Sequence, residues 1–95
     1  MSVSFELNGQ VLALAGELTK HSLRQDLSQL FPDFMRQRQL VIDLDAVSDV
    51  DSAGLAWLVN IIRDCRSGDI ALEWSHMHPN VLQLARLSNA QHLFQ

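Results

Sequence analysis

The sequence predicts a single α/β domain over residues 1–95, with a mixed sheet of four to five strands in the order β-β-α-β-α-β-α. Three observations predict this class. Short apolar runs alternate with segments of helical periodicity. The dipeptide Asn8-Gly9 between two apolar runs is typical of an antiparallel hairpin. The strand, turn and helix expected over 40–66 predict a right-handed crossover, so helices should cover at least one face of the sheet. A chain of this length supports one modest core.

The first half of the chain supplies the hairpin and one helix. Residues 3–7 alternate in hydropathy, and a second apolar run covers 10–16. Thr19 is the expected N-cap of a helix that Pro32 ends. Its apolar stripe would consist of Leu23, Leu27, Leu30 and Phe31. Residues 33–39 fit either a final turn or a loop, with Phe34 and Met35 packed beneath.

The central block, residues 40–66, organises the rest of the chain. Residues 40–44 predict a buried strand, and 45–52 predict a polar turn. A helix follows, with Asp51 and Ser52 as capping residues at its start. Its apolar stripe comprises Leu55, Leu58, Val59, Ile62 and Cys65. The turn would lie at the carboxyl end of the strand, where open α/β sheets place their functional sites.

The last third predicts one more crossover unit. Residues 67–69 should end the central helix, and 70–74 read as a strand with Trp74 near its end. His78-Pro79 offers a cap and a first-turn proline for a third helix. The buried side of that helix would be formed by Val81, Leu84, Ala85 and Leu87, and the tail should dock Leu93 and Phe94 on the body.

Composition narrows the possible partners. The formal net charge is −4 and Lys20 is the only lysine, so neither nucleic acid nor an anionic membrane surface is expected as a direct partner. The single cysteine, Cys65, predicts a buried structural thiol and a reducing compartment. No signal peptide and no apolar run of about 20 residues is present, so we expect a cytoplasmic protein that inserts into no membrane itself.

Four carboxylates, those of Asp43, Asp45, Asp49 and Asp51, crowd the predicted turn. A metal or phosphoaspartate site of the receiver type would need further acids after the first strand and a lysine near the last one, and the sequence has neither. A solvated, capped turn is therefore preferred, with no metal. The segment around Ser52 is not the G-x-S-x-G nucleophile elbow, and no glycine-rich phosphate loop occurs. We therefore predict no enzyme activity, no catalytic residue and no cofactor.

The start of the central helix is the predicted partner surface. Gly54 allows a close backbone approach, either within the domain or by a partner. At 100° per residue Trp57 points away from the apolar stripe. It would then be either a partner hot spot or a ring lying flat under a loop such as 33–38. The predicted partner-binding residues are Asp51, Ser52, Ala53, Gly54, Trp57, Asn60 and Ile61.

The stretch VIDLDAVSDVDSAGLAWL at 41–58 resembles the signature of the STAS domain, found in anti-sigma-factor antagonists and sulphate-transporter tails. In that family an apolar strand, an acidic turn, Asp-Ser or Asp-Thr, a small residue, Gly and Leu open the second helix. The resemblance places Ser52 at the position that is phosphorylated or contacts a partner. A phosphate there would lie near the positive end of the helix dipole but beside Asp51.

Two further stretches, LALAGELT at 12–19 and VLQLARLSNAQHLF at 81–94, are similar to one branch of the family. That branch is the small cytoplasmic STAS subunit of the bacterial phospholipid ABC transporter. The resemblance implies an accessory subunit that supports outer-membrane lipid asymmetry. It would bind the ATPase subunit through Ser52 and reach the membrane permease and inner membrane through that partner. The alternative is an anti-sigma-factor antagonist switched by phosphorylation of Ser52. A small hydrolase using Ser52 is the third and weakest hypothesis.

Overall fold

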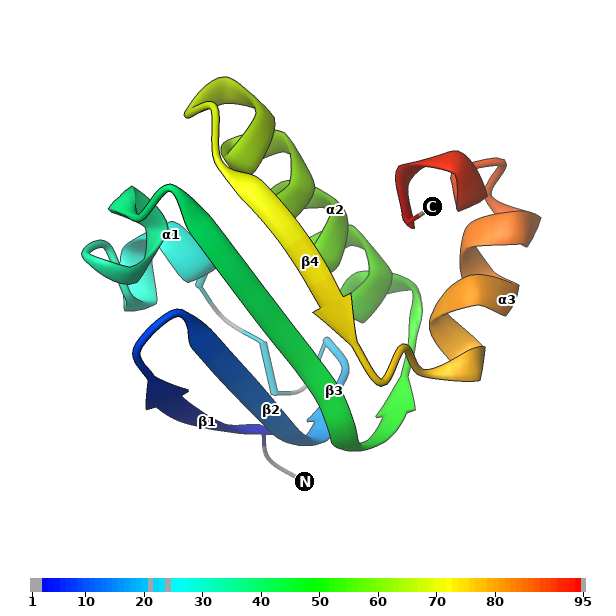
Figure 1. Cartoon of the computed structure of the whole chain (residues 1–95). Coiled ribbons are helices and arrows are strands. Elements are labelled where there is room, and N and C mark those ends of the chain that lie inside the picture. Colours follow the sequence, from blue (N-terminus) through cyan, green and yellow to red (C-terminus); the bar gives the residue numbers. More distant parts are fainter. Residues whose placement is uncertain (1–2, 21, 24, 95) are drawn as a thin grey trace.

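A four-stranded mixed sheet forms the centre of the computed structural model, which describes residues 3–20, 22–23 and 25–94 (Figure 1). The strands are β1 (Val3–Asn8), β2 (Val11–Leu18), β3 (Gln39–Val50) and β4 (Ala71–Ser75), in the spatial order β1-β2-β3-β4. β1 pairs antiparallel with β2, while β2, β3 and β4 are parallel. The predicted mixed α/β architecture is confirmed.

The hairpin forms as the Asn-Gly signal predicts. Asn8 pairs with Val11, which leaves only Gly9 and Gln10 in the connection. Gly9 has φ +63°, a left-handed conformation that suits glycine. β2 is longer than expected, since it continues past Gly16 to Leu18. The hairpin therefore delivers the chain to the carboxyl edge of the parallel strands.

β3 is also much longer than the predicted strand at 40–44. It runs to Val50, so the polar turn expected over 45–52 is wrong for most of its length. The reason is pairing with β2, which continues through Leu18↔Val50 across two register irregularities. Val47 and Val50 face the core at 6% and 5% exposure, while the polar residues between them face outward. The turn itself is confined to the junction at Asp51.

Two helices match their predicted starts. α2 spans Ser52–Ser67 with Asp51 as N-cap, and α3 spans Pro79–Leu87 with His78 as N-cap. His78 Nδ1 accepts a hydrogen bond from the Asn80 N–H at 3.1 Å. The tail forms the short 3₁₀ helix η2 (Gln91–Phe94), which docks the buried ring of Phe94 as expected.

The predicted helix between Thr19 and Pro32 is largely wrong. Of the residues described between Thr19 and Pro32, only those of α1 (Leu27–Leu30) are helical, and the 3₁₀ turn η1 (Phe34–Arg36) follows. Thr19 instead closes a turn, since its carbonyl accepts N–H bonds from Ser22 and Leu23 at 3.0 Å. Gln29 Oε1 accepts the Asp26 N–H at 3.3 Å at the real helix start. We call the segment 22–31 the strap. Outside α1 its described residues form no regular element, and its residues Leu23, Leu30 and Phe31 pack against the core.

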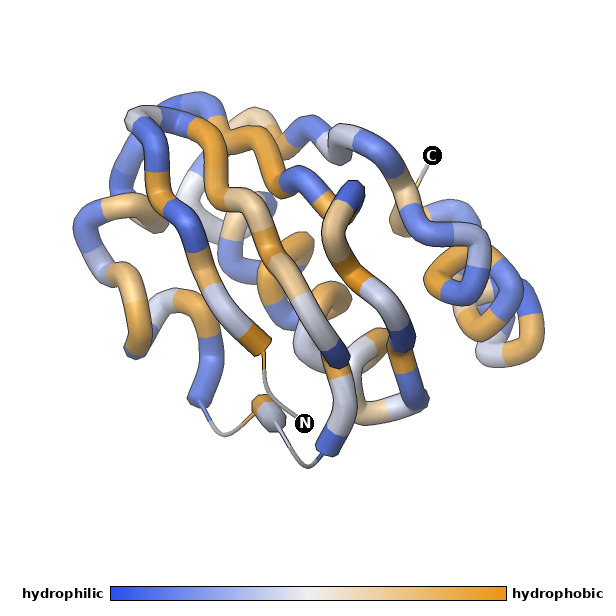
Figure 2. The backbone as a smooth tube through the Cα atoms, turned by 90° about the horizontal axis from the view of Figure 1, so that it is seen from below, coloured by the Kyte–Doolittle hydropathy of each residue, from blue (hydrophilic) through white to orange (hydrophobic). Residues whose placement is uncertain are grey.

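The core lies between the sheet and the helices, with α2 behind β3 and β4 in Figure 1. Hydrophobic and polar positions alternate along β1 in Figure 2, as expected for a strand with one covered face. The core-facing residues of the middle strands are fully buried, namely Leu12, Leu14, Leu40, Ile42 and Leu44. α2 buries more of its surface than the predicted stripe, and its buried residues are Gly54, Leu55, Trp57, Leu58, Ile61, Ile62 and Cys65.

Candidate functional site

The start of α2 is fixed by the side chain of Asp51. Its Oδ1 accepts the Gly54 N–H at 2.9 Å, and its Oδ2 accepts the Lys20 N–H at 3.1 Å. The Asp51 N–H in turn donates to the Leu18 carbonyl at 3.1 Å. One residue therefore caps the helix and joins it to the end of β2, as the capping preference of Asp predicts. These three hydrogen bonds hold Ser52 in one place at the carboxyl edge of the sheet.

The same contacts set the charge of Asp51. Partial burial on its own would raise the pKa of the carboxyl group. The backbone N–H groups of Gly54, Lys20 and Ala53 outweigh this effect and hold the pKa of Asp51 below its ordinary value. The carboxylate therefore stays ionised beside Ser52 throughout the physiological pH range.

Gly54 makes its close backbone approach inside the domain. A Cβ atom at this position would lie 2.0 Å from the Leu18 carbonyl oxygen and 3.0 Å from Val50 Cγ1. Of the two explanations for this glycine, internal packing is thus the one with direct contacts. It lets α2 start directly against β2, and the residue itself is buried.

The exposed side of the helix start is made of small residues. Ser52, Ala53 and Ala56 are exposed and Asn60 is half-buried. We call these four residues the Ser52 face. The face borders a hollow of about 310 Å³ whose other wall is the strap, where Asp26 Oδ1 accepts a 3.4 Å hydrogen bond from Asn60 Nδ2. Ala56 was missed from the sequence, although its i+4 spacing from Ser52 and i−4 spacing from Asn60 place it on this side of the helix.

Three predicted partner residues are buried instead, namely Gly54, Trp57 and Ile61. Trp57 is 5% exposed and Ile61 is 1% exposed, so the outward orientation expected for the tryptophan is wrong. Trp57 Nε1 donates a 2.8 Å hydrogen bond to the Gln25 carbonyl, and its ring lies 6.1 Å from that of Phe5. The indole is covered by the strap rather than by residues 33–38. Of the predicted partner-binding residues, the structure leaves Asp51, Ser52, Ala53 and Asn60 accessible.

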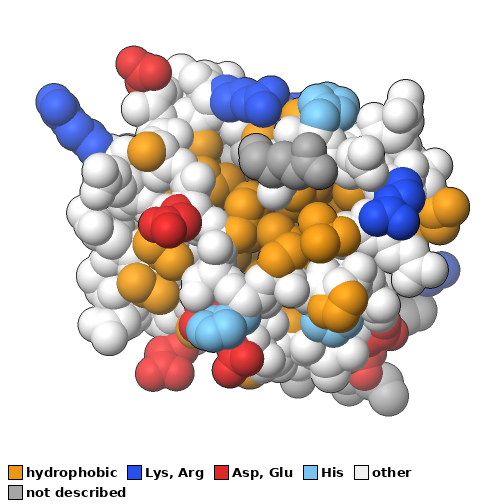
Figure 3. All heavy atoms as spheres, turned by 45° about the vertical axis from the view of Figure 1, so that its right-hand side comes forward, with side chains coloured by type: hydrophobic (Ala, Val, Ile, Leu, Met, Phe, Trp, Pro, Cys, Tyr) orange, Lys and Arg blue, Asp and Glu red, His pale blue; other side chains and the backbone are white. Residues whose placement is uncertain are grey.

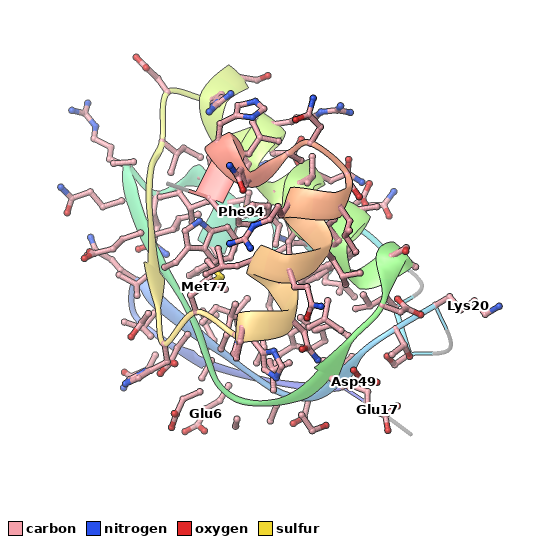
Figure 4. The ribbon with its side chains drawn as sticks, turned by 90° about the vertical axis from the view of Figure 1, so that its right-hand side faces the viewer. Glu6, Glu17, Lys20, Asp49, Met77 and Phe94 are labelled. Carbon is pink, nitrogen blue, oxygen red and sulfur yellow. The ribbon has the colours of Figure 1, made fainter. Side chains whose placement is uncertain are left out.

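Three of the four carboxylates expected to crowd the turn, those of Asp43, Asp45 and Asp49, are spread along β3, while Asp51 follows it as the N-cap of α2. Asp43 bonds His76 Nδ1 at 3.0 Å, and Asp49 pairs in register with Glu17 of β2. Figure 4 shows Glu17 and Asp49 close together, with Lys20 pointing outward beyond them. Within the described part of the chain no three His, Cys, Asp or Glu side chains are grouped as a metal site. The arrangement therefore makes this edge acidic without gathering metal ligands.

The Ser52 hydroxyl is exposed and has no hydrogen-bond partner among the described residues. A hydrolytic nucleophile needs a base that is hydrogen-bonded to it, and no side chain in the described part of the chain makes such a bond to Ser52. Cys65 is 2% exposed. Burial, together with the nearby Asp64 carboxylate, raises the pKa of its thiol to about 11.

In the part of the chain that the structure describes, no helix is long and apolar enough to cross a membrane.

Comparison with known proteins gives the family. A family model described as "Mlab, STAS domain" matches residues 1–95. The anti-sigma factor antagonist SpoIIAA in its unphosphorylated form superposes with a TM-score of 0.68 at 18% identity, covering 96% of this chain and 84% of that one. A crystal structure of Mglu gives a TM-score of 0.55 at 17% identity, covering 80% of this chain and only 20% of that one. No curated protein sequence gives a significant match.

At these identities the structural likenesses show the fold alone. The family match is different, because it spans the whole chain, including the strand, cap and helix start that hold Ser52. On that match, the chain belongs to the MlaB-like branch of the STAS domain family.

Proposed function

We propose that this protein is a non-catalytic accessory subunit of a phospholipid-transporting ABC complex that maintains outer-membrane lipid asymmetry. The observation that carries the proposal is the full-length match to the family described as "Mlab, STAS domain". In this role the Ser52 face binds the ATPase subunit and supports its assembly or activity. The chain then lies at the cytoplasmic side of the inner membrane through that partner and the attached permease.

The geometry of the Ser52 face supports this role. Its side chains are small, so a partner surface can approach the helix backbone closely, and the cap fixes the helix relative to the sheet. A stable interface buries roughly 800 Å² on each partner, which is more than four small residues provide. The flanking exposed residues on the turn after β2, on the strap and at the end of β3 would complete it, namely Lys20, Gln25, Asp26, Ser48 and Asp49.

Co-expression with the ATPase and permease subunits tests the proposal. Wild-type protein should co-purify with them, and Ala56→Glu should not, because a buried unpaired carboxylate in an interface is costly. Ser67→Glu is the matched control, since it makes an exposed carboxylate at the other end of the same helix and should leave the complex intact. Wild-type protein that never co-purifies with the ATPase, or Ala56→Glu that does so normally, would show that the proposed function or its surface is wrong.

The second candidate is an anti-sigma-factor antagonist whose Ser52 is phosphorylated by a cognate kinase. It is favoured by the exposed Ser52 hydroxyl and by the structural likeness to SpoIIAA, which at 18% identity concerns the fold. A pull-down separates the two candidates. Recovery of a serine kinase with phosphate on Ser52, measured by mass spectrometry, favours the antagonist. Recovery of an ATPase and a permease favours the transporter subunit.

A further inference from the structure

The free edge of the sheet at β4 presents unpaired main-chain groups. β4 is last in the strand order and pairs only with β3. The Ala71 N–H donates to the Arg38 carbonyl at 2.8 Å, so Ala71 and every second residue after it face β3. The N–H and C=O groups of Leu72 and Trp74 therefore point away from the sheet. No described residue is hydrogen-bonded to them.

An apolar groove runs beside this edge. It has a volume of about 540 Å³, within the roughly 300–1,000 Å³ typical of ligand pockets. Its walls are β4, the second half of α2, and η2. Its two charged lining residues are Arg66 and Glu73, and the remaining lining is apolar, namely Ile62, Cys65, Ile70, Leu72, Trp74, Met77, Leu93 and Phe94. Figure 3 shows hydrophobic side chains gathered in this hollow, and Figure 4 shows Met77 and Phe94 on the same side of the domain. Leu72 and Trp74 are only half-buried because this groove is open.

The outer side of the edge carries a negative charge. Glu73 lies between Leu72 and Trp74, so strand alternation turns its side chain toward the opposite face of the sheet, while the residue itself still borders the groove at the strand edge. It is exposed and forms no ion pair with any described residue. Asp43, on the neighbouring strand β3, faces the same way, since Ser75 is its register partner, but its carboxylate is already bonded to His76 Nδ1 at 3.0 Å. A strand placed beside β4 would meet a largely apolar groove on one face and the unpaired Glu73 carboxylate on the other.

We propose that the β4 edge binds an extended segment of a partner protein, which adds a strand to the sheet and alternates apolar and basic residues. Unpaired N–H and C=O groups at a sheet edge pair with an added strand. Apolar side chains of the added strand fill the groove, and a basic side chain between them pairs with Glu73. The site is distinct from the Ser52 face, because Cys65 follows Ser52 by 13 positions in α2, which is about 20 Å along a helix.

The test uses the full chain, labelled with ¹⁵N, and the synthetic peptide acetyl-Ser-Val-Lys-Val-Lys-Val-Ser-amide. Addition of the peptide should shift the amide signals of Leu72 and Trp74 and slow their exchange with solvent. An acidic peptide with Glu in place of both Lys should bind wild-type protein about fivefold more weakly. Glu73→Lys, an exposed substitution, should reverse that order. Ser52→Asp should bind the basic peptide like wild type, so failure of the transporter hypothesis leaves this result unchanged.

Three outcomes would overturn the proposal. The first is no peptide binding at millimolar concentration. The second is binding whose amide shifts map away from β4 or whose charge preference ignores Glu73→Lys. The third is a homodimer that already protects the Leu72 and Trp74 amides and dissociates on dilution, which would make the occupant a second copy of this chain.

Discussion

Gly54→Ala should destabilise the domain, although alanine is the better helix former. In an open helix position the change would gain about 1 kcal/mol. Here the new Cβ atom would lie 2.0 Å from the Leu18 carbonyl oxygen and 2.8 Å from the Leu18 carbonyl carbon. Both atoms belong to a backbone that is held in the sheet, so α2 must shift. Overpacking costs about 1–3 kcal/mol, and contact with a fixed backbone belongs at the upper end. We expect a net loss of about 2 kcal/mol.

Urea melts followed by circular dichroism measure this loss. For a domain of this size, 2 kcal/mol corresponds to a fall of about 8–16 °C in Tm. Gly68→Ala is the matched control at the end of the same helix. Its Cβ would meet the flexible Ile70 Cδ1 at 3.3 Å and the Asp64 carbonyl at 3.4 Å, so it should change stability much less. A Gly54→Ala variant as stable as wild type, or more stable, would refute the reasoning.

Four further outcomes follow from the same structure. Trp57→Ala should lower the free energy of unfolding by about 3–5 kcal/mol, comparable to the 2–5 kcal/mol expected for Leu58→Ala. In urea melts of both variants, a much smaller loss for Trp57→Ala would mean that the tryptophan is exposed. Because the pKa of Asp51 is lower in the folded state, its stabilisation is present above the unfolded pKa near 4 and is lost as pH falls through the folded value. Asp51→Asn should therefore narrow the difference between urea midpoints at pH 7 and pH 3, and an unchanged difference would contradict this linkage. With a pKa of about 11, the Cys65 thiol should react with a thiol reagent at pH 8 only after denaturation, and rapid reaction of the native protein would contradict its burial. Ser52→Asp should weaken partner binding more than Ser52→Ala, because the ionised Asp51 opposes a second charge, and equal losses would assign the effect to the hydroxyl group.

The elements with local chemical signals could be predicted from the sequence. Asn8-Gly9 gave the hairpin, Asp51 gave the start of α2, and His78-Pro79 gave the start of α3. Each signal acts within a few residues, through φ preference or a capping bond, so no tertiary information is needed. The length of β3 had no such signal. Its second half carries polar side chains on the outer face, and only the pairing with β2 keeps it extended.

The direction of Trp57 depended on a segment far away in sequence. The sequence of α2 does not identify the segment that covers the Trp57 side of the helix. That segment is the strap, whose described residues are helical only in α1. One signal was available. Trp57 and Ile61 are an i,i+4 apolar pair beside Leu58 and Ile62, so the apolar face was wide enough to be covered on two sides. Of the predicted site, Asp51, Ser52, Ala53 and Asn60 remained accessible.

Buried and exposed residues alternate within one turn at the start of α2, and this decides how binding data there can be interpreted. If the domain has a stability of about 5 kcal/mol, at the low end for native proteins, Gly54→Ala leaves about 3 kcal/mol and under 1% unfolded protein. A large loss of partner binding in that variant would then come from displacement of α2 and not from unfolding. The displacement would stretch the Asp51–Leu18 and Asp51–Lys20 hydrogen bonds, which are 3.1 Å each. Amide exchange at Lys20 and Gly54 would then rise together with the binding loss. Ala56→Glu, which touches no such bond, should abolish binding with these amides still protected, and only that combination identifies a direct contact.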